Sequence, residues 1–373
     1  MSERSDVGIE HMGERSDVGI EHMSEQRSAL VVDWPLAGRT AARLVRPGPR
    51  ASPAQAAAVV AELHDAARRA EGPVREVTAL ADGAAVAAAQ VLDRPRWVAT
   101  AAISMGSLSG TAQRSGGPGP GWAGRSAGLQ VGAVLSYLAG AVLGQYDPFA
   151  VTAVGRARGS LLLVAPNVVA VERALHVDPS DFRLWVCLHE VTHRVQFTAT
   201  PWLTDYMADT VDTLTAGGDG SSGMLLGRVS GAVRSLARGD ERPDGLLGVL
   251  SVLQAQPQRV ALARLMALGT LLEGHADHVM DAVGPAVVPS VREIREAFNQ
   301  RRARPSNPVH RLLRALLGID AKIAQYERGK VFVDHVVRQA GMAAFNEVWT
   351  CADTLPVDAE IADPALWMRR VLA

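Results

Sequence analysis

The chain has 373 residues, of which 38 are basic and 39 acidic, a formal net charge of -1 at pH 7, and 48% hydrophobic residues. This length and composition predict a globular protein with enough apolar residues for a large core, in one or two domains. Because the charges balance and no long run of one sign occurs, we expect no nucleic-acid partner and no patch that binds an anionic membrane. These numbers do not indicate an oligomeric state.

The first residues contain a tandem repeat, in which residues 3–12 recur word for word as residues 14–23. We expect residues 1–27 to form a disordered tail, because so polar a segment cannot bury a core, and residues 28–373 to form the folded domain. The tail lacks the apolar stretch of a signal peptide. The chain has only two cysteines, Cys187 and Cys351, which are too few for a disulfide framework. The expected location is therefore the cytoplasm.

Beyond the tail, the pattern is mainly that of helices separated by Gly and Pro. The first predicted helix begins at Asp33-Trp34-Pro35, where Asp33 can cap it and Pro35 fits its first turn, and runs to about residue 45. Alanine-rich stretches at 53–71 and 76–92 predict two further helices. A fourth predicted helix begins at 93–95 and runs toward residue 113.

Residues 126–144 are nearly all apolar or small, over a length close to that of a membrane span. Small residues recur in this segment at every fourth position: Gly128, Gly132, Ser136, Gly140 and Gly144. This spacing lets another helix approach one face closely, in a soluble core as well as in a bilayer. Since no second comparable span exists, and Gln130 and Tyr137 interrupt this one, we favour a buried helix and expect no membrane association.

A short apolar run at 159–166, bounded by Gly and Pro, is the best candidate for a strand. Further along, Asp178 is placed to cap a helix that runs to about residue 199, and a long apolar helical pattern covers 258–283. An arginine-rich helix at 290–304 is interpreted as a solvated face, and two or three helices follow residue 307. The predicted fold class is therefore mainly α with a small β-sheet, an α+β fold.

The helix predicted at 178–199 contains the pattern His-Glu-Val-Thr-His at residues 189–193. On a helix, residues i and i+4 lie one turn apart on the same face, so His189 and His193 can bind one zinc ion. Glu190 can then act on the zinc-bound water, taking its proton and delivering it to the leaving group. The alternative interpretation is a pair of core histidines with satisfied hydrogen bonds.

A hydrolytic zinc site requires a third protein ligand and an open position. The metzincin pattern would need Gly and His where this chain has Gln196 and Ala199, which excludes that class. In the helix predicted at 258–283, Glu273 is the candidate third ligand. Asp277, one turn further on, can accept the second ring N–H of a ligating histidine and so fix its tautomer.

Two histidines flank this acidic pair, His275 and His278. Either could replace Glu273 as the ligand, or could stabilise a developing oxyanion. The remaining alternative for the whole cluster is the ordinary polar face of a surface helix.

These residues resemble an actinobacterial family of zincin-like metallopeptidases of unknown substrate, which is associated with biosynthesis of the deazaflavin coenzyme. The resemblance extends from about residue 31 onward and rests on the segments 32–36, 144–148, 161–167, 189–202 and 273–278, on Leu355-Pro356 and on Trp367. It implies a zincin-like core with additional helices, in which the strand near Leu161 precedes the motif helix and is the edge that binds an extended substrate. The spacer between His193 and Glu273 is much longer than is usual in zincins with a glutamate ligand.

The prediction from the residues and the resemblance together is a cytoplasmic, zinc-dependent hydrolase of the metallopeptidase type, acting on a peptide or a small amide. One alternative is a zinc-binding scaffold or binding protein that keeps a peptidase fold without catalysis. Another is a hydrolase of a small amide or ester metabolite.

Overall fold

The structure is a computed structural model that describes residues 32–86, 88–108, 121–150, 159–215, 256–303 and 319–373. The predicted tail at 1–27 lies outside these residues. The helices of the first half are α1 (Trp34–Leu44), α2 (Pro53–Thr78), α3 (Arg94–Leu108), α4 (Trp122–Leu138), α5 (Ala165–Leu175) and α6 (Pro179–Ala199). They are followed by α7 (Trp202–Thr215), α10 (Gln256–Val283), α11 (Val291–Ala303), α13 (Ile319–Phe345), α14 (Asp358–Ala362) and α15 (Pro364–Val371). With a sheet of three short strands, this confirms the predicted α+β class.

The sheet has the order β1 (Gln90–Leu92), β3 (Ser160–Val164), β2 (Gly144–Asp147), with β1 parallel and β2 antiparallel to β3. The strand predicted at 159–166 is therefore confirmed as β3. The expectation that it forms the substrate-binding edge is wrong, because it is paired on both sides. Within the described sheet, β2 is an edge strand.

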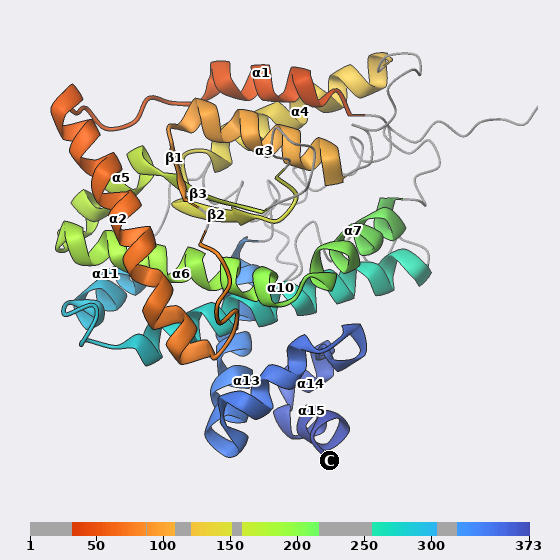
Figure 1. Ribbon diagram of the computed structural model, residues 1–373. Helices are drawn as coiled ribbons and strands as arrows, with labels where there is room; N and C mark the ends of the chain where they lie inside the picture. The colour runs from red at the N-terminus through yellow and green to blue at the C-terminus, as the bar shows by residue number, and fades with distance from the viewer. Residues whose placement is uncertain (1–31, 87, 109–120, 151–158, 216–255, 304–318) are drawn as a thin grey trace, which may run out of the picture.

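Helices cover both faces of this sheet (Figure 1). Leu161 and Leu163 of β3 pack in one cluster with α2 and α6, whereas Leu162 and Val164 pack in another with α1, α3 and α4. Successive side chains of a strand point to opposite faces, which explains why an uninterrupted apolar run forms β3. The C-terminal helices lie on the far side of α10 from the sheet, where Trp367 joins a third cluster (Figure 1).

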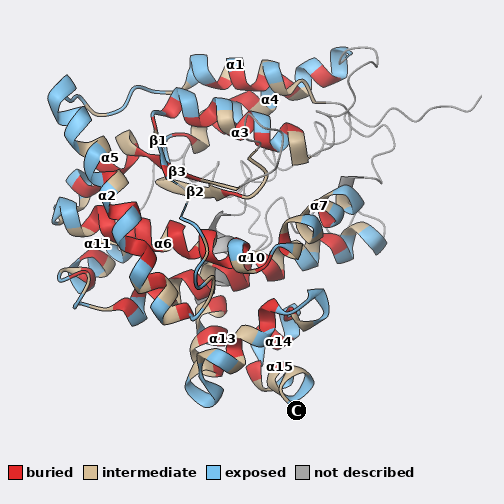
Figure 2. Ribbon diagram, in the orientation of Figure 1, coloured by how far each residue is buried: buried red, intermediate tan, exposed pale blue. Residues whose placement is uncertain are grey.

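Helix α6 lies at the centre of the molecule and is mostly buried (Figure 2). Its start follows the predicted signals, since the Asp178 side chain accepts a hydrogen bond from the backbone N–H of Asp181 at 2.9 Å and Pro179 occupies the first turn. Leu188 and Val191 are fully buried. This apolar side anchors the helix in the core and leaves its histidine-bearing side facing α10.

Two predicted helices differ from the structure. The helix expected to stop at residue 71 continues through Pro73 to Thr78, because its buried stripe, which includes Ala70 and Val74, packs on α6 and outweighs the local cost of a proline. Ala79, in the left-handed conformation with φ 52°, ends it. The helix expected at 76–92 is wrong, because the end of that stretch pairs with β3 as β1.

The apolar segment at 126–144 forms the C-terminal part of α4 and the start of β2. Gly128 and Gly132 do allow close approach, since a β-carbon on Gly132 would lie 2.7 Å from the carbonyl oxygen of Ala37 in α1. Gly140 and Gly144 lie beyond the helix, so the stripe of small residues is shorter than predicted. None of the described helices combines the length and apolarity that crossing a bilayer requires.

Candidate metal centre

The predicted site residues lie where α6 and α10 pack against each other. His189 and His193 of α6 face Glu273 of α10, and one ligand atom of each lies within 4.8 Å of the others. The two Nε2 atoms are 3.2 Å apart, and Glu273 carboxylate oxygens lie 3.4 Å from His189 Nε2 and 3.9 Å from His193 Nε2. The tertiary structure thus brings Glu273 of α10 to two histidines that lie one turn apart on α6.

This donor set fits a zinc ion. Ligand atoms of a tetrahedral zinc site lie about 3.3 Å apart, given Zn–N distances of about 2.0–2.1 Å. The separations of 3.2 and 3.4 Å match that value, and the third, at 3.9 Å, is longer. Two imidazoles and one carboxylate are also one of the ligand sets of catalytic zinc sites, which keep the fourth position open. Among the described residues, no fourth His, Cys, Asp or Glu belongs to the group.

The pKa values of the two histidines are shifted in opposite directions. Burial lowers the pKa of His189, but the hydrogen bond and charge of Glu273 outweigh it and raise that pKa to about 9. The pKa of His193 is lowered, first by burial and then by the charge of His189. His193 is therefore held in the neutral form, which is the form that binds a metal.

Glu190 is buried beside this group. Burial raises its pKa to about 7, against the opposite effect of His189 and with a further rise from the negative charge of Glu273. A carboxylate with a pKa near neutrality can both accept and return a proton, as a general base must.

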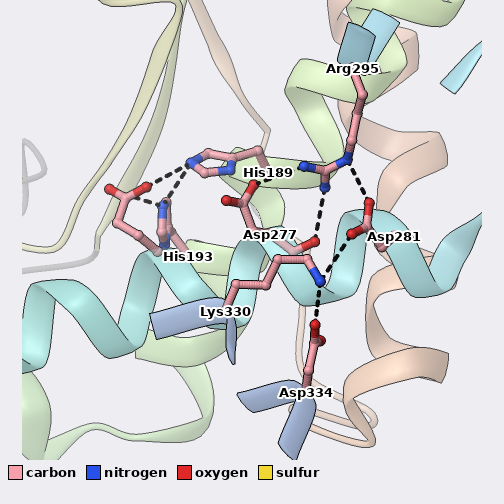
Figure 3. Close-up of polar contacts among 8 residues, drawn as sticks. His189, His193, Asp277, Asp281, Arg295, Lys330 and Asp334 are labelled. Carbon is pink, nitrogen blue, oxygen red and sulfur yellow. Dashed lines mark hydrogen bonds and ion pairs between the residues drawn. The ribbon is translucent and has the colours of Figure 1, made fainter. Parts of the chain in front are cut away.

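Asp277 lies between the ring of His189 and Arg295 (Figure 3). The Arg295 Nη1 atom is 3.6 Å from the Asp277 carboxylate, and its Nη2 donates a 3.0 Å hydrogen bond to the Asp277 backbone carbonyl. The negative charge of Asp277 contributes to the raised pKa of His189. Arg295 belongs to the helix interpreted as a solvated face, and that interpretation is wrong here because Arg295 pairs with α10.

The same arginine continues a charged network on this side of α10 (Figure 3). Its Nε lies 2.5 Å from Asp281, which lies 3.2 Å from Lys330 of α13, and Lys330 in turn pairs with Asp334. The network ties α10, α11 and α13 together behind Asp277.

The structure does not bring His275 or His278 into the group. His275 is fully buried on another side of α10, with its ring centroid 5.1 Å from that of Phe345, and burial lowers its pKa to about 3. His278 makes a 2.7 Å hydrogen bond through Nδ1 with Asp334. Their positions i+2 and i+5 from Glu273 explain this, since such residues point to other sides of a helix.

The sequence did not indicate that two further residues, Gln196 and Gly144, lie next to the site. The Oε1 atom of Gln196 lies 2.9 Å from Nδ1 of His193. Gln196 follows His193 by three residues on the same helix, and this spacing is the signal that could have identified it. Gly144, the first residue of the edge strand β2, lies against the side chain of Glu190. No local pattern predicts that second contact.

Comparison with known proteins gives two matches. A crystal structure from Chloroflexus aurantiacus, described as that of a candidate hydrolase with a novel fold, is similar to this chain with 28% sequence identity and a TM-score of 0.64. The similarity covers 91% of this chain and 98% of that chain. No curated protein matches the chain. The family model described as zincin-like metallopeptidase matches residues 32–368. Because this match spans far more than half of the chain, the chain belongs to the zincin-like metallopeptidase family.

Proposed function

We propose that the protein is a zinc-dependent hydrolase that cleaves peptides, with Glu190 as its general base. The observation that carries the proposal is the convergence of His189, His193 and Glu273 on one point, with the buried Glu190 beside them. A zinc ion held by these three ligands would acidify a water molecule and polarise the substrate carbonyl.

The protein's own residues would then perform the proton transfers. Glu190 takes the proton of the attacking water and delivers it to the leaving amine, which requires a carboxylate that can both accept and return a proton. Asp277 acts as the partner of His189, holding that ring in place through its negative charge.

The position of β2 supports a peptide as the substrate. This strand pairs with β3 along one edge, and its first residue, Gly144, touches the side chain of Glu190. An extended peptide can add to the other edge of a strand through main-chain hydrogen bonds, which would carry its carbonyl groups past the base.

A zinc-binding scaffold is the second candidate. Structural zinc sites close their coordination with four protein ligands. The described residues supply three ligands, and the carboxylate of Glu190 lies beside them without being a ligand. This difference favours the enzyme. A small amide or ester is the alternative substrate within the same chemistry.

The deciding experiment compares the wild type with Glu190→Gln and with chelator-treated protein in a digest of a peptide library and a panel of small amides. Glu190→Gln keeps the side-chain shape and the three ligands but removes the base, so turnover should fall by a factor on the order of a hundred or more. Its zinc content and melting temperature should stay as in the wild type. Glu293→Gln, on the exposed side of α11, is the matched control and should leave all three unchanged.

Absence of cleavage of every peptide and amide by zinc-loaded wild type, together with a fourth protein ligand filling the open position in a zinc-bound structure, would support the scaffold instead. Turnover by Glu190→Gln equal to that of the wild type would show that Glu190 is not the general base.

We further propose a cytoplasmic location, which is supported by the free thiols of Cys187 and Cys351. A role connected with the deazaflavin coenzyme stays a prediction from the resemblance.

A further inference from the structure

Gln196 forms a buried bridge between α6 and α10. Its side chain is fully buried, with Oε1 2.9 Å from His193 Nδ1 and Nε2 3.0 Å from the backbone carbonyl of Leu272. The same Nε2 lies 3.0 Å from Nδ1 of His275. Every polar atom of this amide therefore faces a specific partner.

The carbonyl of Leu272 determines which way the amide points. A carbonyl oxygen only accepts hydrogen bonds, so the atom facing it must be the NH₂ group of Gln196. The reversed amide would place two acceptors 3.0 Å apart in a buried position, which is unfavourable. The oxygen of the amide consequently faces His193.

This orientation in turn determines the tautomer of His193. Because Oε1 of Gln196 only accepts, Nδ1 of His193 must donate, and the proton of the neutral ring resides on Nδ1. Its Nε2 then carries the lone pair, and this is the atom that lies 3.2 Å from His189 Nε2. A metal ligand needs this form of the ring.

His275 completes the bridge from the other side. Its Nδ1 accepts a hydrogen from Gln196, so the ring proton lies on Nε2, which has no hydrogen-bond partner within the described part of the chain. The ring is enclosed by Phe345 and Trp349, with centroids 5.1 and 5.6 Å away. An unpaired buried N–H destabilises a fold. The one hydrogen bond that the described residues give this imidazole is the one with Gln196.

We propose that Gln196 is a positioning residue of the metal centre: held by Leu272 and His275, it fixes the orientation and the Nδ1–H tautomer of His193, so that the Nε2 lone pair faces the ligand group. The proposal rests on the proposed function for the identity of the metal. The tautomer itself is a property of the metal-free protein.

The first test is nuclear magnetic resonance of metal-free protein labelled with ¹⁵N only in its ten histidines. The His193 signals are assigned by their loss in His193→Gln. Free imidazole side chains favour the Nε2–H form, so an Nδ1–H signature at His193 would be the mark of the Gln196 contact. An Nε2–H signature in the wild type would overturn the proposal without any further variant.

The second test is Gln196→Met, which keeps the length of the side chain but removes the acceptor. His193 should shift toward the Nε2–H form, and the zinc affinity, measured by competition with a chromophoric chelator, should fall by about ten- to a hundredfold. The control is Thr192→Val, which removes a buried 2.8 Å hydrogen bond to the Leu188 carbonyl of the same helix. Thr192→Val should change neither the tautomer nor the zinc affinity.

A third variant, His275→Phe, separates positioning from mere packing. It removes the acceptor that holds Gln196 and also removes the unpaired N–H. We expect a smaller loss of zinc affinity than in Gln196→Met. The melting temperature should stay close to that of the wild type, because the variant also removes a destabilising unpaired N–H. A lower melting temperature with unchanged zinc affinity and tautomer would assign His275 to the core alone and contradict its part in the bridge.

The outcomes distinguish this proposal from the proposed function. If the wild type shows the Nδ1–H form but takes up no zinc, the metal assignment fails and the positioning contact stands. If the wild type binds zinc and Gln196→Met keeps its tautomer and affinity, the positioning role is refuted and the metal centre stands.

Discussion

Gly144 and Glu190 touch so closely that no side chain fits between them. A β-carbon on Gly144 would lie 2.7 Å from Cγ of Glu190 and 2.9 Å from Cδ, well inside van der Waals contact. This contact joins the edge strand β2 to the residue that we propose as the base. The two residues lie 46 positions apart in the chain, so only the packing of β2 on α6 brings them together.

Gly144→Ala should therefore impair catalysis more than folding. The added methyl group must displace the Glu190 side chain, which is long enough to move, and we expect turnover to fall by about tenfold or more with zinc content retained. Gly269→Ala is the control, since a β-carbon there meets nothing within 4 Å. Equal turnover in Gly144→Ala and the wild type would show that the Glu190 position is not critical.

Removal of a ligand should remove the metal. His189→Ala, His193→Ala and Glu273→Ala should each reduce bound zinc from about one per chain to little or none, because two ligands hold zinc poorly. Asp277→Asn should weaken zinc binding by only about ten- to a hundredfold, as loss of a ligand's partner does. Elemental analysis and chelator competition measure both effects.

His278→Ala is the control for the ligand variants, because His278 pairs with Asp334 outside the group. Retention of full zinc affinity by Glu273→Ala, with loss in His278→Ala, would transfer the third ligand to that histidine.

Gly132 should tolerate no larger residue. A β-carbon there would lie 2.7 Å from the Ala37 carbonyl oxygen and 2.7 Å from Cβ of Thr40, both in the closely packed α1, so Gly132→Leu should lower the melting temperature clearly through overpacking. At Gly140 the nearest atom to such a β-carbon would be the carbonyl oxygen of Tyr137, 3.5 Å away, so Gly140→Leu should lower the melting temperature much less. Similar melting temperatures for the two variants would contradict this packing.

The C-terminal helices should show a pH-dependent contribution to stability. Hydrogen bonds from Arg370, at 2.6 and 2.8 Å, lower the pKa of the buried Glu360 below its ordinary value of 4.5, although burial opposes them. A carboxylate with a lowered folded-state pKa stabilises the fold above the unfolded-state value, and this contribution is lost as the pH falls through the folded-state pKa. Glu360→Gln should therefore destabilise the protein at pH 7 and progressively less below about pH 4.5.

Urea unfolding at several pH values measures this difference. Asp358→Asn provides the comparison within the same helix, since the Asp358 side chain is 71% exposed and its ion pair with Arg328 should contribute little. A destabilisation by Glu360→Gln that is constant with pH would exclude the ionised pair as its cause.

The sequence by itself determined the features that depend on near neighbours in the chain. The capping signal at Asp178 and Pro179 predicts the start of α6, and the spacing of four residues places His189 and His193 on one face. The uninterrupted apolar run predicts β3. Each of these follows from helix or strand periodicity over a few residues, which any surrounding fold would respect.

The tertiary structure alone decided which distant segments meet. Strands β1 and β2 exist because β3 offers them hydrogen bonds, so neither their presence nor the edge position of β2 could be predicted from their own residues. The side of α10 that faces α6 selects Glu273 and leaves His275 in the core, and the same packing gives Gln196 its partners on α10, Leu272 and His275. A side chain's partner across a helix interface depends on the crossing of two helices, and local periodicity contains no information about that crossing.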